Sequence, residues 1–366
     1  MEEEQEDDPK TLITGLPDDL GLQCIARVPR VYHQTLAQVC KPWRSLVRSE
    51  LFVSARSSLK TAQHFLYFMV RTHDSCFKWF VLSHYNHLKQ TCPLPPAPAP
   101  TMGSACVVLG SSLYILGGSI NDLPSPNTWV YDACLNSWRN GPRMRVAREF
   151  AAAGTINQKI YVVGGCQADT WARSASWAEV FDQKVGHWAP IPSPIEMREK
   201  WMHGNAVLKG KLLAMADRGG VVDDPRGGTS DGSSNSEKLG SWSFVSMELD
   251  TGWRGRAAVV KGILFCYDFL GKIRGYDSEE DKWMELQGVK KSLPKFLCGA
   301  SLANVGEKLY VVWEGLGRNK ETELLCAEVD VENKGVGLLW GTVVWYQVIL
   351  SLPKGASTIH CLSLGL

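Results

Sequence analysis

Short apolar runs recur along most of the chain and alternate with polar turns. The clearest run lies in 158–165, where it ends on Gly164 and Gly165. A run of this length predicts a β-strand, and the glycine pair predicts a tight turn after it. Equivalent runs, about 45 to 52 residues apart, are centred on Tyr114, Tyr161, Leu213, Phe265 and Tyr310. A period near 50 residues is typical of the blades of a β-propeller rather than of a helical solenoid.

A second signature follows most of these runs: an aromatic residue, an aspartate and, six residues after the aspartate, a tryptophan. It occurs as Tyr131-Asp132 with Trp138, Phe181-Asp182 with Trp188, and Tyr276-Asp277 with Trp283. In the third and fifth repeats we assign the same positions to Leu249-Asp250 with Trp253 and to Val329-Asp330 with Trp345. These spacings predict four-stranded blades whose aromatic residues pack between neighbours, with a shortened hairpin in the third repeat and a lengthened one in the fifth.

The N-terminal part of the chain has a helical pattern instead. Leu20, Cys24, Ile25 and Val28 fall on one helical face before Pro29, and a second set at helical spacing is interrupted by Pro42. About 45 residues is near the size at which a domain struggles to bury enough surface to be stable alone. The apolar positions therefore predict either a helical cap packed on the next domain or a surface that docks another protein.

We expect three parts: an acidic disordered tail over 1–11, a small all-α module over 12–58 and an all-β propeller over 62–366. The repeats are placed at about 101–146, 147–197, 201–254, 255–292 and 297–353. The segment 62–96 fits the last three strands of a blade and 355–366 fits the first, which predicts a sixth blade closed by both termini. The segment 217–241 is rich in Gly, Ser and Asn and predicts a flexible loop.

Composition excludes some function classes. The net charge of +1 gives no field that would favour nucleic acid or an anionic membrane as a partner. No apolar run is long enough to predict a membrane span, and none at the start predicts a signal peptide, so we expect a cytoplasmic or nuclear protein. The eleven cysteines are odd in number and scattered, which favours free thiols in a reducing compartment.

The sequence offers little evidence for chemistry. Cys76, His84, His87 and Cys92 are the best candidates for a metal site, but their spacing matches no common zinc site, and a surface hairpin is favoured. The glycine pairs belong to no phosphate-binding motif, and neither a nucleophile with its base nor paired carboxylates stand out. We therefore predict no catalytic residue, no metal and no cofactor.

Two groups of motifs resemble known families. Residues 16–20, 27–29 and 39–47 resemble an F-box, and the repeats with a glycine pair, an aromatic residue and a spaced tryptophan resemble kelch repeats. Their order is similar to that of plant F-box/kelch-repeat proteins. The later repeats depart from the pattern, because Ala216-Asp217, Tyr267-Asp268 and Trp313-Glu314 stand where a glycine pair is expected. The resemblance implies a small all-α F-box module followed by a kelch-type propeller.

The resemblance also implies a function. The F-box would dock on the Skp adaptor, and through it on the cullin, of an SCF-type ubiquitin ligase, while the propeller holds an unknown target protein and other subunits transfer ubiquitin. The implied adaptor contacts are Leu16, Pro17, Leu20, Ile25, Leu36, Val39, Cys40, Trp43 and Leu46. Some of these residues must form the core of the module. We expect Val39 and Trp43 in the core, and Leu16, Pro17 and Leu20 on the surface.

Arginine and tryptophan in the loops between strands are the best candidates for target binding, because these residue types often anchor interfaces. The candidates are Trp171, Arg173, Trp177, Arg143, Arg145 and Arg198. Nearby Arg148 and Trp201 lie at the ends of strands and could be structural. Two other functions stay open: a kelch scaffold that joins no ligase, and a copper enzyme similar to galactose oxidase, which would need two converging histidines.

Overall fold

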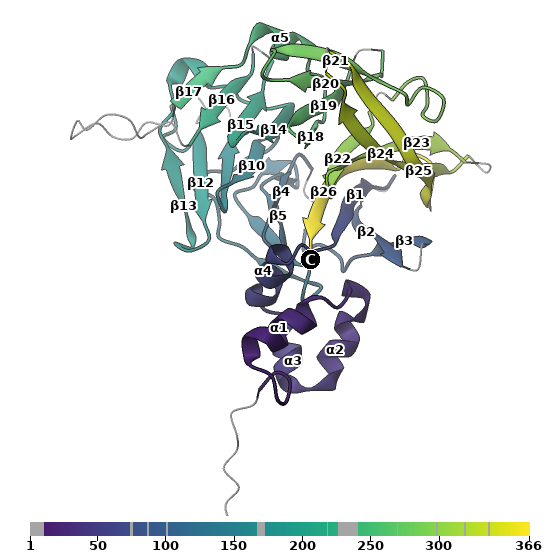
Figure 1. Ribbon diagram of the computed structural model, residues 1–366. Helices are drawn as coiled ribbons and strands as arrows, with labels where there is room; N and C mark the ends of the chain where they lie inside the picture. The colour runs from purple at the N-terminus through teal and green to yellow at the C-terminus, as the bar shows by residue number, and fades with distance from the viewer. Residues whose placement is uncertain are drawn as a thin grey trace, which may run out of the picture.

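The computed structural model has a helical module at one end and a ring of β-sheets beyond it (Figure 1). It describes residues 11–73, 76–85, 88–99, 102–166, 173–217, 219–225, 241–268, 270–297, 299–317, 320–335 and 337–366. The chain is thus a small helical module followed by a propeller-like all-β fold, as the sequence pattern predicts.

Short helices with clear start signals build the helical module. They are α1 Asp18–Ala26, the 3-10 turn η1 Arg30–Tyr32, α2 His33–Val39, α3 Lys41–Leu46 and α4 Glu50–Ser58. Pro17 caps α1 and the two aspartates in its first turn favour a helix N-terminus, while Ser49 Oγ accepts a hydrogen bond from the Phe52 N–H at the start of α4. None of the helices in the described residues is long and apolar enough to cross a membrane.

A small set of hydrogen bonds joins the helical module to the propeller. The buried Arg56 side chain donates to the carbonyl oxygens of Ala26, Val28 and Thr61, which fixes the linker against the helices. Arg30 Nη2 donates to the Ala133 carbonyl 2.7 Å away, in a propeller turn. Figure 1 shows the C-terminus beside the module, where the backbones of Gln63 and Leu366 exchange two hydrogen bonds. These contacts give the module one orientation on the ring.

Four of the sheets have four antiparallel strands each. Unit one has the order β4 Ala105–Leu109, β5 Ser112–Leu116, β8 Thr128–Asp132 and β9 Ser137–Asn140, with a small hairpin of β6 Ser119–Ile120 and β7 Leu123–Pro124 beside it. Unit two has β10 Ala152–Ile156, β11 Lys159–Val163, β12 Ala178–Asp182 and β13 His187–Ile191, and the turn η2 Ile195–Met197 follows it. Unit three has β14 Gly204–Leu208, β15 Lys211–Met215, β16 Val221–Asp224 and β17 Ser241–Phe244, followed by helix α5 Met247–Gly252.

The fourth of these sheets, the closing sheet, contains strands from both ends of the sequence. Its order is β26-β1-β2-β3, with β26 Ser357–Gly365, β1 His64–Arg71, β2 Phe77–Tyr85 and β3 Leu88–Pro93. The register runs from His64 opposite Gly365 to Arg71 opposite Ser357. In this pairing β26 lies at the edge of the sheet, beside the strands from the beginning of the propeller. Pairing the two ends removes an open sheet edge.

The remaining sheet has eight strands. It follows the order β18 Ala258–Val260, β19 Ile263–Tyr267, β20 Ile273–Asp277, β21 Lys282–Gln287, β25 Leu339–Leu352, β24 Thr322–Asn333, β23 Lys308–Leu316 and β22 Ser301–Val305. All its neighbours are antiparallel except β21 and β25, which pair in parallel at Leu286 with Leu339 and Gln287 with Trp340. In the described chain, the inner strands β4, β10, β14, β18, β22 and β26 contact one another in sequence, and β26 contacts β4. These inner strands therefore surround the centre of the ring.

The aromatic residues of the repeat signatures pack within a sheet and against its neighbour. Tyr131 and Trp138 lie opposite each other in unit one, as do Phe181 and Trp188 in unit two, with tilted rings whose centroids are 5.2 and 5.4 Å apart. Phe181 and Trp188 also pack in one core cluster with Tyr114 and Val130 of unit one. The glycine pairs make the turns, as predicted: Gly117 and Gly165 have φ of 63° and 72°. A Cβ on Gly117 would lie 2.5 Å from the Arg148 carbonyl oxygen, so no other residue fits without a backbone shift.

The third unit corrects two predictions. Residues 217–241 are not one continuous loop, because β16 pairs with β15 and β17 inside this segment; residues 226–240 lie outside the described residues. Asp223 pairs with Trp242 in the register that Phe181 and Trp188 have in unit two. Leu249 and Asp250, assigned to that position from the sequence, lie in α5 instead. In the sequence the short strand β16 has only a weak pattern, and the long polar insertion after it obscured the strand.

Candidate functional site

The two ends of the propeller have different roles in the fold. Ala105, at the start of β4, lies opposite Leu116, at the end of β5, so the turn after β5 shares one end of the sheet with the start of β4. The turn between β8 and β9, which contains Ala133, lies at the other end and contacts the helical module. We call these the pocket end and the module end. Gln183, in the corresponding turn of unit two, also contacts the module, through Glu50.

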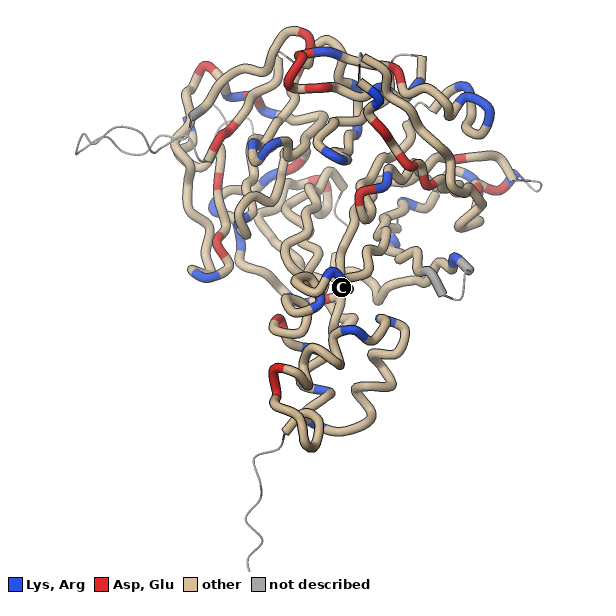
Figure 2. Tube along the Cα trace, in the orientation of Figure 1, with Lys and Arg blue, Asp and Glu red and all other residues tan. Residues whose placement is uncertain are grey.

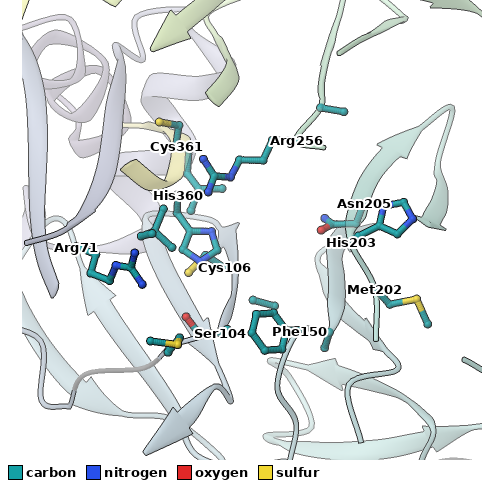
Figure 3. Close-up of a pocket in the computed structure, with 18 of the residues that line it drawn as sticks. Arg71, Ser104, Cys106, Phe150, Met202, His203, Asn205, Arg256, His360 and Cys361 are labelled. Carbon is teal, nitrogen blue, oxygen red and sulfur yellow. The ribbon is translucent and has the colours of Figure 1, made fainter. Parts of the chain in front are cut away.

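A central pocket of about 440 Å³ opens among the inner strands at the pocket end. Its polar lining comes from segments far apart in the sequence: Arg71, Ser104, Cys106, His203, Asn205, Arg256 and His360 (Figure 3). Arg71 ends β1, whereas Arg256 precedes β18. Only the closure of the ring brings these side chains around one cavity.

The central pocket is electropositive. Two arginines line it, and none of its described lining residues is an aspartate or a glutamate. Arg256 is held in place, because its Nη1 donates to Ser301 Oγ at 2.6 Å and to the Thr358 carbonyl at 2.9 Å. A positioned guanidinium in an enclosed site favours a carboxylate or phosphate oxygen. The chemistry of this pocket is therefore suited to an anionic group.

His360 adds no charge to the central pocket near neutral pH. Removal of its ring from water lowers the pKa of His360 to about 4, and the positive charge of Arg256 adds to this, against a hydrogen bond to the Ser104 backbone. The ring lies parallel to Trp79, with centroids 6.5 Å apart. His360 is thus a neutral hydrogen-bonding group that the pocket presents beside two permanent charges.

The predicted target-binding residues divide into exposed and buried groups. Arg143, Arg145 and Arg173 are exposed at the pocket end, and Arg145 Nε donates to Ser176 Oγ at 3.2 Å. Trp177 and Arg198 are buried, which corrects their assignment. Trp177 Nε1 donates to the Glu199 carbonyl, and Arg198 binds the carbonyls of Ser174 and Ser193, so both hold loops together. Trp171 lies outside the described residues.

Arg148 has the structural role that the sequence left open. Its side chain is fully buried and forms an ion pair with Glu179, with Nη2 and Oε1 2.7 Å apart. It also donates to the carbonyl oxygens of Gly164, Ser176 and Trp177. One guanidinium therefore joins the loop before β10 to the turn between β11 and β12, which shapes the pocket end without meeting a ligand.

The helical module presents several of the predicted adaptor contacts on its surface. Pro17, Leu20 and Val39 are exposed, and Leu16, Leu36, Cys40 and Trp43 are half-buried. Val39 is 60% exposed, so its expected place in the core is wrong. Trp43 is anchored as expected, because Nε1 donates to the Leu12 carbonyl.

Two of the predicted contacts are core residues. Ile25 and Leu46 are 2% and 8% exposed and pack with Ala26, Val47 and Phe52, so neither faces a partner. The sequence reasoning also missed exposed apolar residues: Val31, Tyr32 and Leu51. Leu51 borders a shallow groove of about 580 Å³ together with Leu12, Leu22 and Pro42. Leu51 shares the helical spacing of Leu46 and Val47, but spacing alone does not tell which of the three is exposed.

Little else in the described chain indicates chemistry. Among the described residues no group of three or more His, Cys, Asp or Glu is placed to hold a metal ion, and His87 of the candidate set lies outside them. The ten described cysteines are free thiols. Burial raises the pKa of Cys266 to about 11, so this thiol stays protonated and is a poor nucleophile near neutral pH.

Comparisons with known proteins agree with this architecture. A family model described as F-box domain matches residues 13–54, and one described as FKB95, Kelch-repeats domain matches 76–350. Two relatives in Arabidopsis thaliana, F-box/kelch-repeat proteins At4g39550 and At4g39580, are 31% and 32% identical, over 95% of this chain and 93% and 92% of their own lengths. A solved structure titled "Structure of YjhT" superposes with a TM-score of 0.51 at 14% identity, covers 73% of this chain and 90% of its own, and supports the fold alone.

Proposed function

The chain belongs to the F-box/kelch-repeat family, and from that premise we propose that it is a non-catalytic substrate-recognition subunit of an SCF-type ubiquitin ligase. The F-box module docks on a Skp adaptor and through it on a cullin, and the propeller holds the protein to be ubiquitinated. Its contribution to the reaction is the effective concentration of the target near the charged enzyme.

The observation that carries this proposal is the apolar surface of the F-box module. Leu20, Val39 and Leu51 are exposed on a module whose core is small. Leu51 also borders the shallow groove lined by Leu12, Leu22 and Pro42. An exposed apolar surface of this kind favours a protein interface. Arg30 and Glu50 contact the propeller, whereas Leu20 and Val39 take no part in these contacts and are available for an adaptor.

We place the target at the pocket end. The module end is partly covered by the F-box helices, whereas the pocket end carries the central pocket and the exposed Arg143, Arg145 and Arg173. An acidic group of the target would enter between Arg71 and Arg256, and the outer arginines would contact the surrounding surface. Adaptor and target would then sit at opposite ends of the ring.

We also propose that the ring has six blades. The eight-stranded sheet is two antiparallel sets of four strands that touch through only two parallel residue pairs, at the outer strands β21 and β25. Counting each set as a blade gives every inner strand one blade of its own. Five repeats and the closing sheet then account for the whole ring.

The test is direct binding of the full chain to a purified Skp adaptor. Leu16→Ala combined with Pro17→Ala should weaken binding by about tenfold or more, because both residues lie at the exposed start of the module. Val39→Ser should weaken it too, without loss of thermal stability. Leu123→Ala, an exposed apolar residue on the propeller, is the matched control and should bind as the unchanged chain does.

Unchanged adaptor binding in the Leu16 and Pro17 variant would refute the docking surface. Absence of any adaptor binding by the full chain would favour the scaffold alternative, in which the F-box module serves only as a cap. Metal analysis of the purified protein addresses the copper-enzyme alternative, which requires a bound stoichiometric metal.

A further inference from the structure

A second cavity, of about 470 Å³, lies at the pocket end of the propeller, away from the central pocket. It lies between residues 270–272, in the turn after β19, and residues 289–297, in the loop after β21. Ala258 at the start of β18 pairs opposite Phe265 near the end of β19, which places the turn after β19 at the same end as Arg256. The two cavities therefore open toward the same side of the ring.

The walls of this cavity are apolar and held in place. Its floor consists of the buried side chains Ile273, Leu286, Val289, Leu293 and Leu297. The Leu297 N–H donates to the Gly271 carbonyl at 2.9 Å, which fixes one wall against the other. Asp268 Oδ1 accepts from the backbone N–H groups of Leu270 and Lys272 and so stabilises the turn. A preformed cavity loses little entropy when it is filled.

Two large apolar side chains stand at the rim without being buried. Leu270 is 58% exposed and Phe296 is 70% exposed, and both line the cavity. Exposed apolar residues scattered singly need no explanation, but here they border a concave apolar floor. A bulky apolar side chain from a partner would cover both of them and the floor together.

The rim is also basic. Lys272 and Lys290 share one carboxylate, Glu285, at 3.2 and 3.0 Å, and Lys295 lines the cavity beside Phe296. Lys295 forms no ion pair with a described residue. Figure 2 shows the positive charge concentrated along the loop that follows β21. The cavity therefore has an excess of positive charge that a partner with acidic residues would complement.

We propose that this cavity, the lysine-rimmed pocket, binds a segment of the target protein in which a bulky apolar side chain is flanked by acidic residues. The apolar side chain fills the cavity over Ile273 and Leu293, and the carboxylates face Lys290 and Lys295. The inference rests on the proposed role of the propeller as the target-holding module. It adds the chemistry of the segment that is held, at a site apart from the central pocket.

The test uses the full chain and three labelled synthetic peptides in fluorescence anisotropy. One peptide has a tryptophan and a leucine between glutamates, the second has the same pair between lysines, and the third has serines between glutamates. We expect only the first to bind with measurable affinity. Phe296→Ser should weaken that binding by about tenfold, because it removes an apolar wall. Lys295→Glu should weaken it by about threefold or more, with a smaller effect at high salt.

Matched controls separate the pocket from its surroundings. Leu316→Ser changes an apolar residue that is 79% exposed outside the pocket, and Lys354→Glu reverses an exposed lysine in another loop of the same end. Both should bind the first peptide as the unchanged chain does. Equal binding of the glutamate-flanked and lysine-flanked peptides, no binding of any peptide, or an unchanged affinity in Phe296→Ser would overturn the proposal. Adaptor binding measured on the same samples shows whether the proposed function fails separately.

Discussion

Units two and three are neighbouring sheets with the same strand register. Residues of opposite character, an aromatic ring and a carboxyl group, occupy the same position in the two sheets. In unit two, Phe181 pairs with Trp188 and both are buried. In unit three, Asp223 takes the position of Phe181, opposite Trp242, and is only 2% exposed. Neither of its carboxyl oxygens has a hydrogen-bond partner in the described part of the chain. The fold therefore tolerates a buried carboxyl where its neighbour has an aromatic ring.

The loops that precede units two and three also differ in how a charged side chain is paired. The Gly118 N–H donates to the Arg148 carbonyl and the Gly165 N–H donates to the Lys200 carbonyl, so Arg148 and Lys200 are equivalent. Arg148 reaches Glu179 in the buried ion pair, whereas Lys200 Nζ lies over the ring of Trp201, 4.1 Å from its centroid. In unit two the buried Arg148 is thus paired with Glu179, whereas in unit three the buried carboxylate of Asp223 has no such partner among the described residues. The cost of a buried charge depends on its partner rather than on its burial.

The largest expected effect comes from breaking the paired charge. Arg148→Met leaves Glu179 buried without its partner and should lower the free energy of unfolding by about 3–5 kcal/mol. Lys200→Met, at the equivalent position, should cost less than about 1 kcal/mol, because it removes only a contact with an aromatic ring. Chemical denaturation of the two variants measures both values.

A double variant checks the cause of that loss. Arg148→Met with Glu179→Leu removes both charges and should recover most of the stability, because no uncompensated carboxylate remains. Equal stability of Arg148→Met and the unchanged chain would contradict the role assigned to this ion pair.

The next effect has the opposite sign. Asp223→Asn removes an unpaired buried carboxylate and should raise the free energy of unfolding at pH 7 by about 1–3 kcal/mol. Asp224→Asn is the control: it removes the surface ion pair with Lys211, at 3.3 Å, but also the repulsion of Asp223, so stability should change by less than about 1 kcal/mol. A destabilised Asp223→Asn variant would show that the carboxylate has a partner that stabilises it.

The smallest expected effect is the pH dependence of the stability difference between Asp223→Asn and the unchanged chain. Burial raises the pKa of Asp223 to about 6, and the charge of Asp224 adds to the rise. As the pH rises from about 4 to about 6, the unfolded chain loses this proton before the folded chain does, so the unchanged protein loses stability that Asp223→Asn keeps. The advantage of Asp223→Asn should therefore vanish below about pH 4 and be constant above about pH 6. Thermal unfolding of both proteins across this range measures the difference, and a constant offset at all pH values would contradict it.

The same comparison shows what the sequence could predict of the fold. Apolar runs of strand length and a fixed spacing to Trp138, Trp188 and Trp283 identified the regular units, because packing between sheets requires those positions. The same spacing did not identify unit three. Its aromatic position holds Asp223, and an insertion separates Asp224 from Trp242, so these positions were assigned to Leu249-Asp250 and Trp253, with a shortened spacing, instead.

The candidate site was less predictable than the fold. Residue type alone selected Trp177 and Arg198, but whether such residues meet solvent depends on how loops from two sheets pack. Arg71 and Arg256 carried no local signal, because they converge only when the ring closes. The lysine-rimmed pocket likewise depends on two loops separated by a complete hairpin.

The pairing of β26 with β1 also sets the order in which the parts of the protein can fold during synthesis. The helices of the F-box module are complete by Ser58, so the module can fold while most of the propeller is still untranslated. The first sheet to begin, at His64, is the last to be completed, because its inner strand ends at Gly365. Until β26 pairs with it, β1 exposes an unpaired edge and the central pocket lacks the wall that carries His360. The helical module is therefore complete before the ring can close.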